Sequence, residues 1–206
     1  MSIFGRISFK DQAFKLREDA ILDAATRILA SKGFDLMTMD DVAAEVGISK
    51  PSLYKHFKSK DELVGAAMIR LIDGALEFWD GLAKELGPVE RLSALLEWAL
   101  RVRLGGGLPF LPSTSPTVRE MLTRNLGYVT KVLRLNNQLK ATVQAGKKQG
   151  GLRADLPDDV ILFSYYARTC DPAVEYLRLY ADMQDDAIVA HMLSVCFEGL
   201  ARPAAQ

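Results

Sequence analysis

The short segment Gly47–Ser49, with the sequence G-I-S, restricts the fold of this chain more than any other feature. Ahead of it, four apolar residues recur at helical spacing and stop at the glycine: Met39, Val42, Ala43 and Val46. Glycine adopts the left-handed conformation that ends a helix more readily than other residues do. A second helical pattern begins directly after the segment, so the sequence predicts two helices joined by a sharp turn.

Helix-start signals stand on both sides of this turn. Thr38 and Asp41 form the S/T-x-x-D/E pattern, in which two side chains cap the first backbone N–H groups of a helix. Ser59 and Glu62 repeat the pattern and predict a long helix from about residue 60 to 85. One helix is therefore expected to begin just after Thr38, and another to lead away from the turn.

A third, short helix is expected between these two, over about residues 50–57. Pro51 fits near its start, because the N–H groups of a first helical turn have no partner within the helix. Leu53 and Phe57 are four residues apart and would face inward together. The polar residues left on the outer face are Lys50, Ser52, Lys55 and His56.

The remaining segments are also helical in pattern, so the predicted fold class is all-α. Leu, Ala, Lys, Glu and Arg are abundant and β-branched runs are scarce, which favours helix over strand. A loop rich in glycine and proline is expected over residues 105–117. The other expected helices cover about residues 16–32, 88–104, 117–149, 155–181 and 185–201. Pro172 lies within the 155–181 segment and is expected to kink or break that helix.

Basic residues are concentrated near the turn, although the whole chain is neutral. The chain has 26 basic and 26 acidic residues, yet residues 48–60 contain four lysines, one histidine and no acid. A local patch of this kind allows a neutral protein to bind phosphate groups.

Cys170 and Cys196 form no metal or disulfide pattern, and no apolar run approaches the ~20 residues of a membrane helix. With no secretory signal in the sequence, we expect a cytoplasmic protein without cofactor, metal or membrane segment.

Residues 17–65 resemble the TetR family of transcriptional regulators. The similarity rests on A-I-L-D-A-A, G-F-D-L-M-T-M-D-D-V-A and E-V-G-I-S-K-P-S-L-Y-K-H-F-K-S-K-D-E-L, in this order and spacing. The resemblance implies a helix-turn-helix DNA-binding domain, assigned to residues 1–60 with a basic arm over 1–15, and a helical effector-binding and dimerisation domain over 61–206. It also implies a homodimer that binds palindromic operator DNA, and most often a repressor that releases DNA when a small molecule binds.

The resemblance places the short helix after the turn in the major groove of DNA, which admits one helix. The predicted contact residues are Lys50, Ser52 and Lys55 at base edges, Tyr54, His56, Lys60 and Thr38 at phosphates, and Ser49 and Pro51 beside them. Pro51 lacks a backbone donor, but its ring can touch a thymine methyl group, so the base preference at this position stays open. Core packing of Tyr54 and a simple surface position of His56 are the alternatives.

The second domain offers candidates for an effector pocket and a dimer interface. Aromatic and apolar side chains that could line a pocket for a largely apolar molecule are Phe78, Trp79, Trp98, Phe110, Met121, Tyr128, Tyr165 and Cys170. A homodimer through the last two helices would use Val160, Ile161, Phe163, Tyr166, Val174, Leu177, Tyr180, Ile188, Val189, Met192, Val195 and Leu200. Ordinary core packing is the alternative for both sets.

Two other functions remain as alternatives. A non-specific or architectural DNA binder is one, but the neutral charge and the large non-basic second domain argue against it. A helical enzyme built on His56, His191 and Cys170 is the other. These residues lie far apart in the chain, and no nucleophile motif or metal-ligand spacing surrounds them, so we predict that the protein is not an enzyme.

Overall fold

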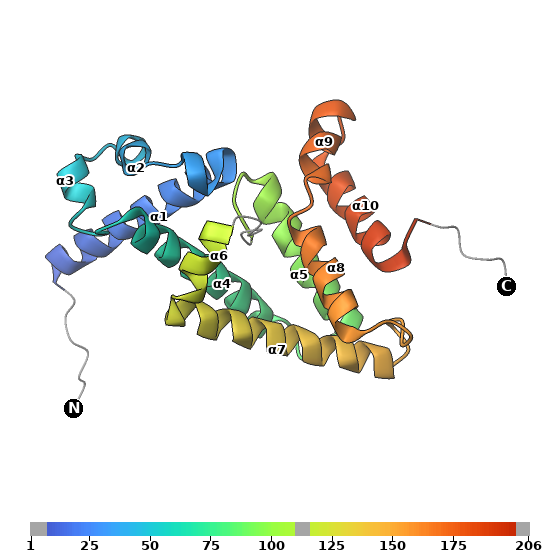
Figure 1. The fold of residues 1–206 in the computed structure, drawn as a ribbon. Coiled ribbons are helices and arrows are strands. Elements are labelled where there is room, and N and C mark those ends of the chain that lie inside the picture. Colours follow the sequence, from blue (N-terminus) through green and yellow to red (C-terminus); the bar gives the residue numbers. More distant parts are fainter. Residues whose placement is uncertain (1–7, 110–115, 201–206) are drawn as a thin grey trace. The chain divides into compact units, whose positions relative to one another are not determined.

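The computed structural model describes residues 8–109 and 116–200, which form helices and no strands (Figure 1). The helices are α1 (Phe9–Leu36), α2 (Met39–Val46), α3 (Lys50–Leu53), α4 (Lys60–Gly81), α5 (Pro88–Leu104), α6 (Pro116–Thr123), α7 (Leu126–Lys148), α8 (Asp158–Thr169), α9 (Ala173–Tyr180) and α10 (Asp185–Glu198). The predicted all-α class is confirmed. None of the helices in these two ranges is both long enough and apolar enough to cross a membrane.

The chain divides between Ala67 and Met68 into two compact units. Helix α4 begins in the first unit and ends in the second. The domain boundary predicted from the sequence lies between residues 60 and 61, where α4 starts.

Several predicted helix boundaries were wrong. The helix expected over 117–149 is two helices, because Asn125 interrupts it and its side chain accepts a hydrogen bond from the backbone N–H of Tyr128, capping α7. The helix expected over 155–181 is also two, since α8 ends at Thr169 and Pro172 precedes α9.

Other differences lie at helix ends. Helix α1 begins at Phe9, within the segment predicted to be a basic arm. Gly33 has φ 74°, so the helical geometry is broken where the first helix was expected to stop. The helix expected to reach residue 57 ends at Leu53, α4 ends at Gly81 rather than near residue 85, and α10 ends at Glu198 rather than residue 201.

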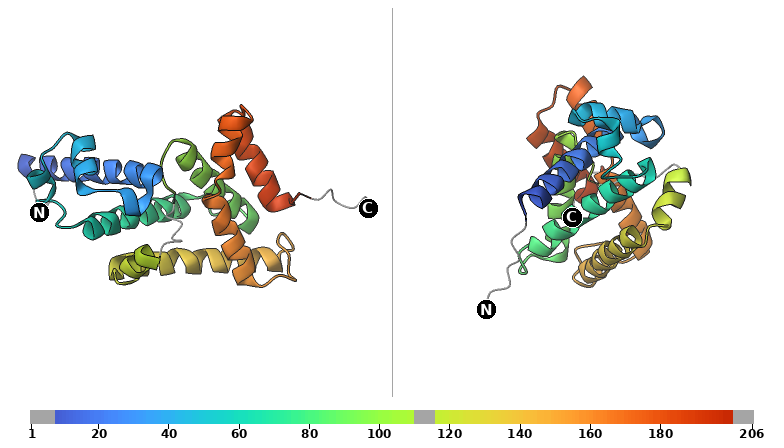
Figure 2. Two further views of the ribbon diagram at one scale, coloured as in Figure 1. Left: turned by 45° about the horizontal axis from the view of Figure 1, so that its top comes forward. Right: turned by 90° about the vertical axis from the view of Figure 1, so that its left-hand side faces the viewer.

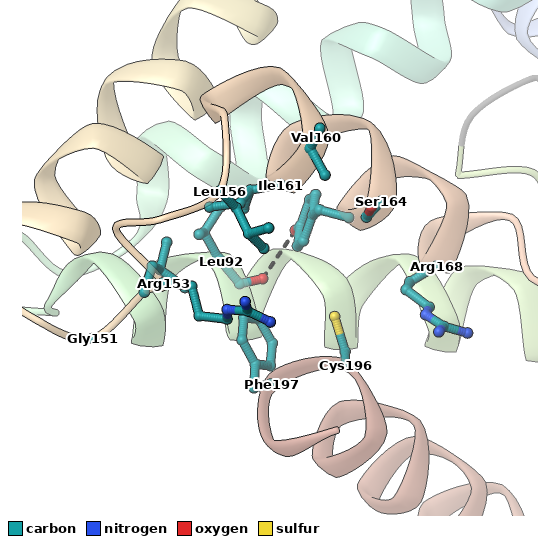
Figure 3. Close-up of a pocket in the computed structure, with 12 residues that line it drawn as sticks. Leu92, Gly151, Arg153, Leu156, Val160, Ile161, Ser164, Arg168, Cys196 and Phe197 are labelled. Atoms are coloured by element: carbon teal, nitrogen blue, oxygen red, sulfur yellow. Dashed lines mark hydrogen bonds between the residues drawn. The ribbon is translucent and has the colours of Figure 1, made fainter. Parts of the chain in front are cut away.

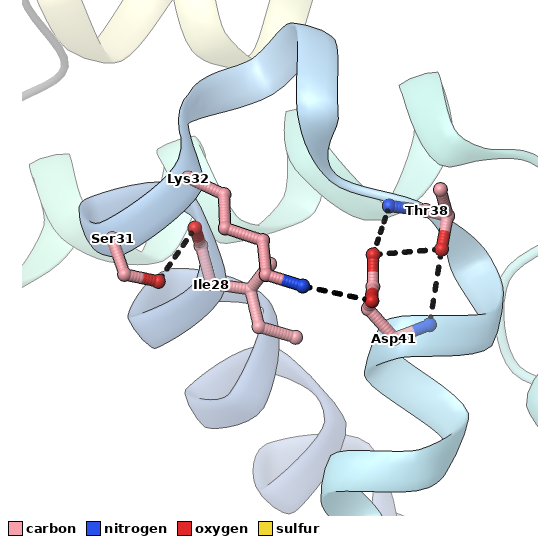
Figure 4. Close-up of polar contacts among 5 residues, drawn as sticks. All are labelled: Ile28, Ser31, Lys32, Thr38 and Asp41. Atoms are coloured by element: carbon pink, nitrogen blue, oxygen red, sulfur yellow. Dashed lines mark hydrogen bonds and ion pairs between the residues drawn. The ribbon is translucent and has the colours of Figure 1, made fainter.

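A capping box fixes the start of α2 (Figure 4). The Thr38 hydroxyl oxygen accepts a hydrogen bond from the Asp41 N–H at 3.1 Å, and the Asp41 carboxylate accepts from the Thr38 N–H at 2.9 Å and from its hydroxyl at 2.7 Å. Lys32 of α1 donates to the other Asp41 oxygen at 2.9 Å. The hydrogen bond from Lys32, and then those from Thr38, lower the pKa of Asp41 to about 2.

The core of the second unit is built around α5. Leu92, Leu95, Leu96, Ala99 and Leu100 are all at most 1% exposed, and α5 packs against α7, α8, α9 and α10 (Figure 2). The apolar residues recur at three- and four-residue spacing on more than one face, which suits a helix surrounded by others.

Truncation of Leu139 on α7 should destabilise the second unit strongly, because this side chain is fully buried in its core. We expect Leu139→Ala to reduce the free energy of unfolding by about 2–5 kcal/mol in urea titrations. Leu133→Ala on the same helix is the matched control, since Leu133 is 55% exposed; its effect should stay within about 0.5 kcal/mol. Equal effects of the two variants would contradict the assigned core.

The capping box predicts a pH-dependent stability. Because the folded-state pKa of Asp41 is lowered from 3.8 to about 2, the ionised carboxylate stabilises the fold above about pH 4 and loses this effect as the pH falls towards 2. Asp41→Asn should therefore lower the melting temperature at pH 7, and the difference from wild type should narrow below about pH 4. Asp35→Asn, which alters an exposed acid outside the capping box, is the matched control.

Candidate nucleic-acid interface

The turn between α2 and α3 is set by Gly47, which has φ 72° and ψ 33°. Its N–H donates to the Ala44 carbonyl at 3.1 Å, and the N–H of Ile48 donates to the Ala43 carbonyl at 3.0 Å. No neighbouring atom would meet a Cβ at Gly47, so the left-handed backbone, and not lack of space, favours glycine here. The Ser49 hydroxyl then caps α3 by accepting from the N–H of Ser52 at 3.4 Å.

Two buried side chains hold α3 against the first unit. Leu53 is fully buried and Phe57, just after the helix, is 4% exposed. Because these two side chains point into the unit, the other residues of α3 and of its flanking segments lie at the surface of the unit. Ser49, Lys50, Pro51, Tyr54 and Lys55 are exposed, and Ser52, His56 and Lys60 are half-buried. The structure therefore brings these eight predicted contact residues together on α3 and its flanks.

Thr38 lies at the exposed start of α2, but both its donors are engaged. Its N–H and its hydroxyl donate to the same carboxylate oxygen of Asp41. A phosphate at this position would have to compete with that carboxylate for a donor. The sequence pattern identified the capping box but not this competition.

His56 has a packing contact that sequence reasoning missed. Its ring stacks on Phe14 of α1, with centroids 4.1 Å apart, and its buried Nδ1 has no hydrogen-bond partner among the residues that the structure describes. Desolvation lowers the pKa of His56, so the ring favours the neutral form. An aromatic residue in α1 facing a residue 42 positions later gives no local signal in the sequence.

The lysines of the basic stretch differ in their surroundings. Lys50 forms an ion pair with Asp40 of α2 at 2.9 Å. The ammonium group of Lys60, at the start of α4, lies 4.2 Å from the centroid of the Phe34 ring. In the described parts of the chain, no ion pair involves Lys55 or Lys58. The net positive charge of this surface is therefore smaller than the count of lysines suggested.

The predicted effector residues of the second unit are distributed over several helices. Trp79 and Tyr165 are buried in the core, and Phe78, Trp98, Tyr128 and Cys170 are partly buried against it. Phe78 stacks on Trp98 with centroids 5.5 Å apart. Met121 is half-buried on α6, and Phe110 lies outside the described residues.

A cavity of about 270 Å³ lies between α5, α8, α10 and the segment 151–156 (Figure 3). Leu92, Ile161 and Phe197 contribute apolar surface, and Arg153 and Arg168 contribute charge. The Tyr165 hydroxyl donates to the Leu92 carbonyl at 2.9 Å across its wall. Of the predicted effector residues that the structure describes, Tyr165 alone lines this cavity.

The predicted dimer residues divide into three groups. Four are buried in their own core and cannot reach a partner: Val174, Ile188, Val189 and Met192. Four are half-buried: Ile161, Tyr166, Leu177 and Val195. Four are exposed: Val160, Phe163, Tyr180 and Leu200.

Comparison with known proteins gives matches at both the domain and the whole-chain level. Residues 21–67 match the model of the bacterial regulatory proteins of the tetR family. The chain is 25% identical over 192 residues to the HTH-type transcriptional repressor KstR2 of Rhodococcus jostii, covering 91% of this chain and 92% of that protein. It is 40% identical over 57 residues to the HTH-type transcriptional activator FasR of Mycolicibacterium smegmatis, about a quarter of either chain.

Solved structures share the fold along most of the chain. AibR in complex with isovaleryl coenzyme A and operator DNA gives a TM-score of 0.66 at 21% identity, covering 88% of this chain and 98% of that one. The ketosteroid transcriptional regulator KstR2 of Mycobacterium tuberculosis gives 0.62 at 20% identity, covering 90% and 95%. The helix-turn-helix geometry and the family model agree over residues 21–67, which match the TetR family of bacterial regulatory proteins, and the fold along most of the chain is similar to that of these solved regulators.

Proposed function

We propose that this chain is a transcriptional repressor that binds palindromic operator DNA as a homodimer and releases it when a small molecule binds the second unit. The observation that carries the proposal is the surface of α3. Buried Leu53 and Phe57 fix the helix, and Lys50 on the helix and Tyr54 and Lys55 directly after it are exposed. The repressor role is supported by the relative that matches along most of the chain.

In this proposal α3 enters the major groove. Lys50, Ser52 and Lys55 are placed to meet base edges, because lysine pairs well with the O6 and N7 acceptors of guanine. Tyr54 and Lys60 flank the helix and would contact phosphates. His56 contributes mainly by packing, since its stack on Phe14 supports α1 against the segment after α3.

A homodimer follows from the limited specificity of one short helix. Two copies related by a twofold axis read half-sites about one helical turn apart, or multiples of a turn. Helix α8 carries an exposed apolar stripe of Val160, Phe163 and Ala167, at i, i+3 and i+7. Such a stripe suits packing against the same helix of a partner.

The effector is proposed to bind within the second unit. Partly buried Phe78, Trp98 and Tyr128 come from α4, α5 and α7, and aromatic surfaces of this kind suit an apolar ligand. The isovaleryl coenzyme A bound to AibR supports an acyl compound as one candidate. By linkage, a ligand that prefers the DNA-free conformation by ~1–3 kcal/mol lowers DNA affinity roughly 5–150-fold.

Two lysine variants test the proposed contacts. Lys50→Ala should relax base preference, because it removes a base contact, whereas Lys60→Ala should weaken binding to every sequence and reduce the salt slope by about one. Fluorescence anisotropy with duplex DNA at several salt concentrations measures both. Lys148→Ala, in α7, removes an exposed lysine elsewhere and is the control. Unchanged DNA binding in both test variants would contradict the docking of α3.

A charge on the α8 stripe tests the dimer. Phe163 is 66% exposed, so Phe163→Asp should leave the fold intact but shift the protein from dimer to monomer in analytical ultracentrifugation. The affinity of this variant for operator DNA should fall as well, because a monomer contacts only one half-site. Leu126→Asp, at an 80% exposed position on α7, should keep the dimer. A Phe163→Asp protein that still dimerises would exclude α8 as the interface.

A further inference from the structure

Asp40 and Lys50 form a donor–acceptor pair on the proposed DNA-contact surface. Asp40 lies in the first turn of α2 and Lys50 is the first residue of α3, so the contact joins the two helices of the turn. The Lys50 Nζ lies 2.9 Å from the Asp40 Oδ2. Both side chains stay accessible, with 50% and 66% of their surface exposed.

The pair has no evident role in stability. Exposed ion pairs contribute little to folding, because water screens them and two flexible side chains must be ordered. The neighbouring Asp41 shows the contrast, since its carboxylate accepts hydrogen bonds from the N–H and the hydroxyl of Thr38 at the helix start. In the described ranges, the Asp40 carboxylate has no hydrogen bond except the one from Lys50.

The pair does matter for any DNA that approaches α3. A carboxylate beside the leading lysine cancels part of its attraction for phosphate and repels the backbone. It also accepts hydrogen bonds, which lysine cannot do. In the major groove, guanine presents the acceptors N7 and O6, and its cytosine partner presents the N4 amino donor. Lys50 and Asp40 together match this pattern, with ammonium on guanine and carboxylate on cytosine.

We propose that Asp40 is a specificity-determining residue that, together with Lys50, selects a G·C pair in each half-site. The inference rests on the proposed function, because it requires α3 to enter the major groove. At a G·C pair the carboxylate gains a hydrogen bond from the cytosine amino group. At an A·T pair in the same orientation, the base facing Asp40 is thymine, which offers no amino donor, and the carboxylate would remain unpaired close to DNA.

Selection of bound duplexes from a randomised library, using the full-length protein, tests this inference. The variants are Asp40→Asn, Lys50→Ala and the double variant, and Glu45→Gln is the control. Glu45 lies on the same helix and pairs with Arg27 of α1 at 3.2 Å, so its neutralisation changes the charge equally without touching α3. Circular dichroism checks folding, and Asp40→Ser serves as a second uncharged variant.

We expect the wild type to require G·C at one position of each half-site, and Lys50→Ala to lose that preference. Asp40→Asn should reduce the preference for G·C there roughly 5–150-fold, and should bind random DNA more tightly with a salt slope steeper by about one. Glu45→Gln should keep the wild-type preference. In the double variant, loss of Asp40 should add nothing to the base preferences of Lys50→Ala.

Other outcomes separate the inference from the function on which it rests. If Asp40→Asn and Asp40→Ser keep the wild-type base preference, or if the Lys50-dependent position is an A·T pair, the inference is overturned while the regulator function stands. If the wild type enriches no sequence at all, the proposed function itself fails.

Discussion

The left-handed backbone at Gly47 is the constraint on which the proposed DNA-contact surface depends. It ends α2 and sends the chain directly into α3, so that Leu53 and Phe57 reach the core of the first unit. Once these two side chains are buried, helical geometry leaves Lys50, Tyr54 and Lys55 facing outward. The capping box at Thr38 fixes the other end of α2, and with it the position of the turn.

The charges on this surface depend on which lysines are paired with acids, and the zero net charge of the whole chain does not reveal this pattern. Asp41 and Asp40 each form an ion pair with a lysine, but the two pairs lie in different surroundings. Lys32 and Asp41 form part of the helix cap, whereas Lys50 and Asp40 occupy the exposed surface beside α3. Lys55 has no such partner among the described residues and keeps its full attraction for phosphate. A regulator needs this balance, because strong attraction to any DNA competes with the search for one site.

Local signals predicted the first unit well and the second unit less well. The glycine turn, the capping boxes and Pro51 at the start of α3 act within a few residues, so the sequence alone located them. The stack of His56 on Phe14 and the pair of Lys50 with Asp40 depend on how separate helices pack, and no short pattern reveals them. In the second unit, the break at Asn125 was missed because the apolar periodicity continues across it, whereas Pro172 indicated the second break from the sequence alone. Apolar residues at helical spacing also failed to distinguish the core from an interface, as buried Ile188 and exposed Phe163 show.

A regulator of this kind must bind a specific, twofold-symmetric DNA sequence through this surface. Equilibrium binding of the full-length protein to its best selected palindrome and to a random duplex, at one salt concentration near 0.15 M, tests it most directly. We expect two chains on each palindrome and an affinity at least about 10³-fold higher than for random DNA. Equal affinity for the two duplexes would contradict it and would favour a non-specific DNA-binding protein.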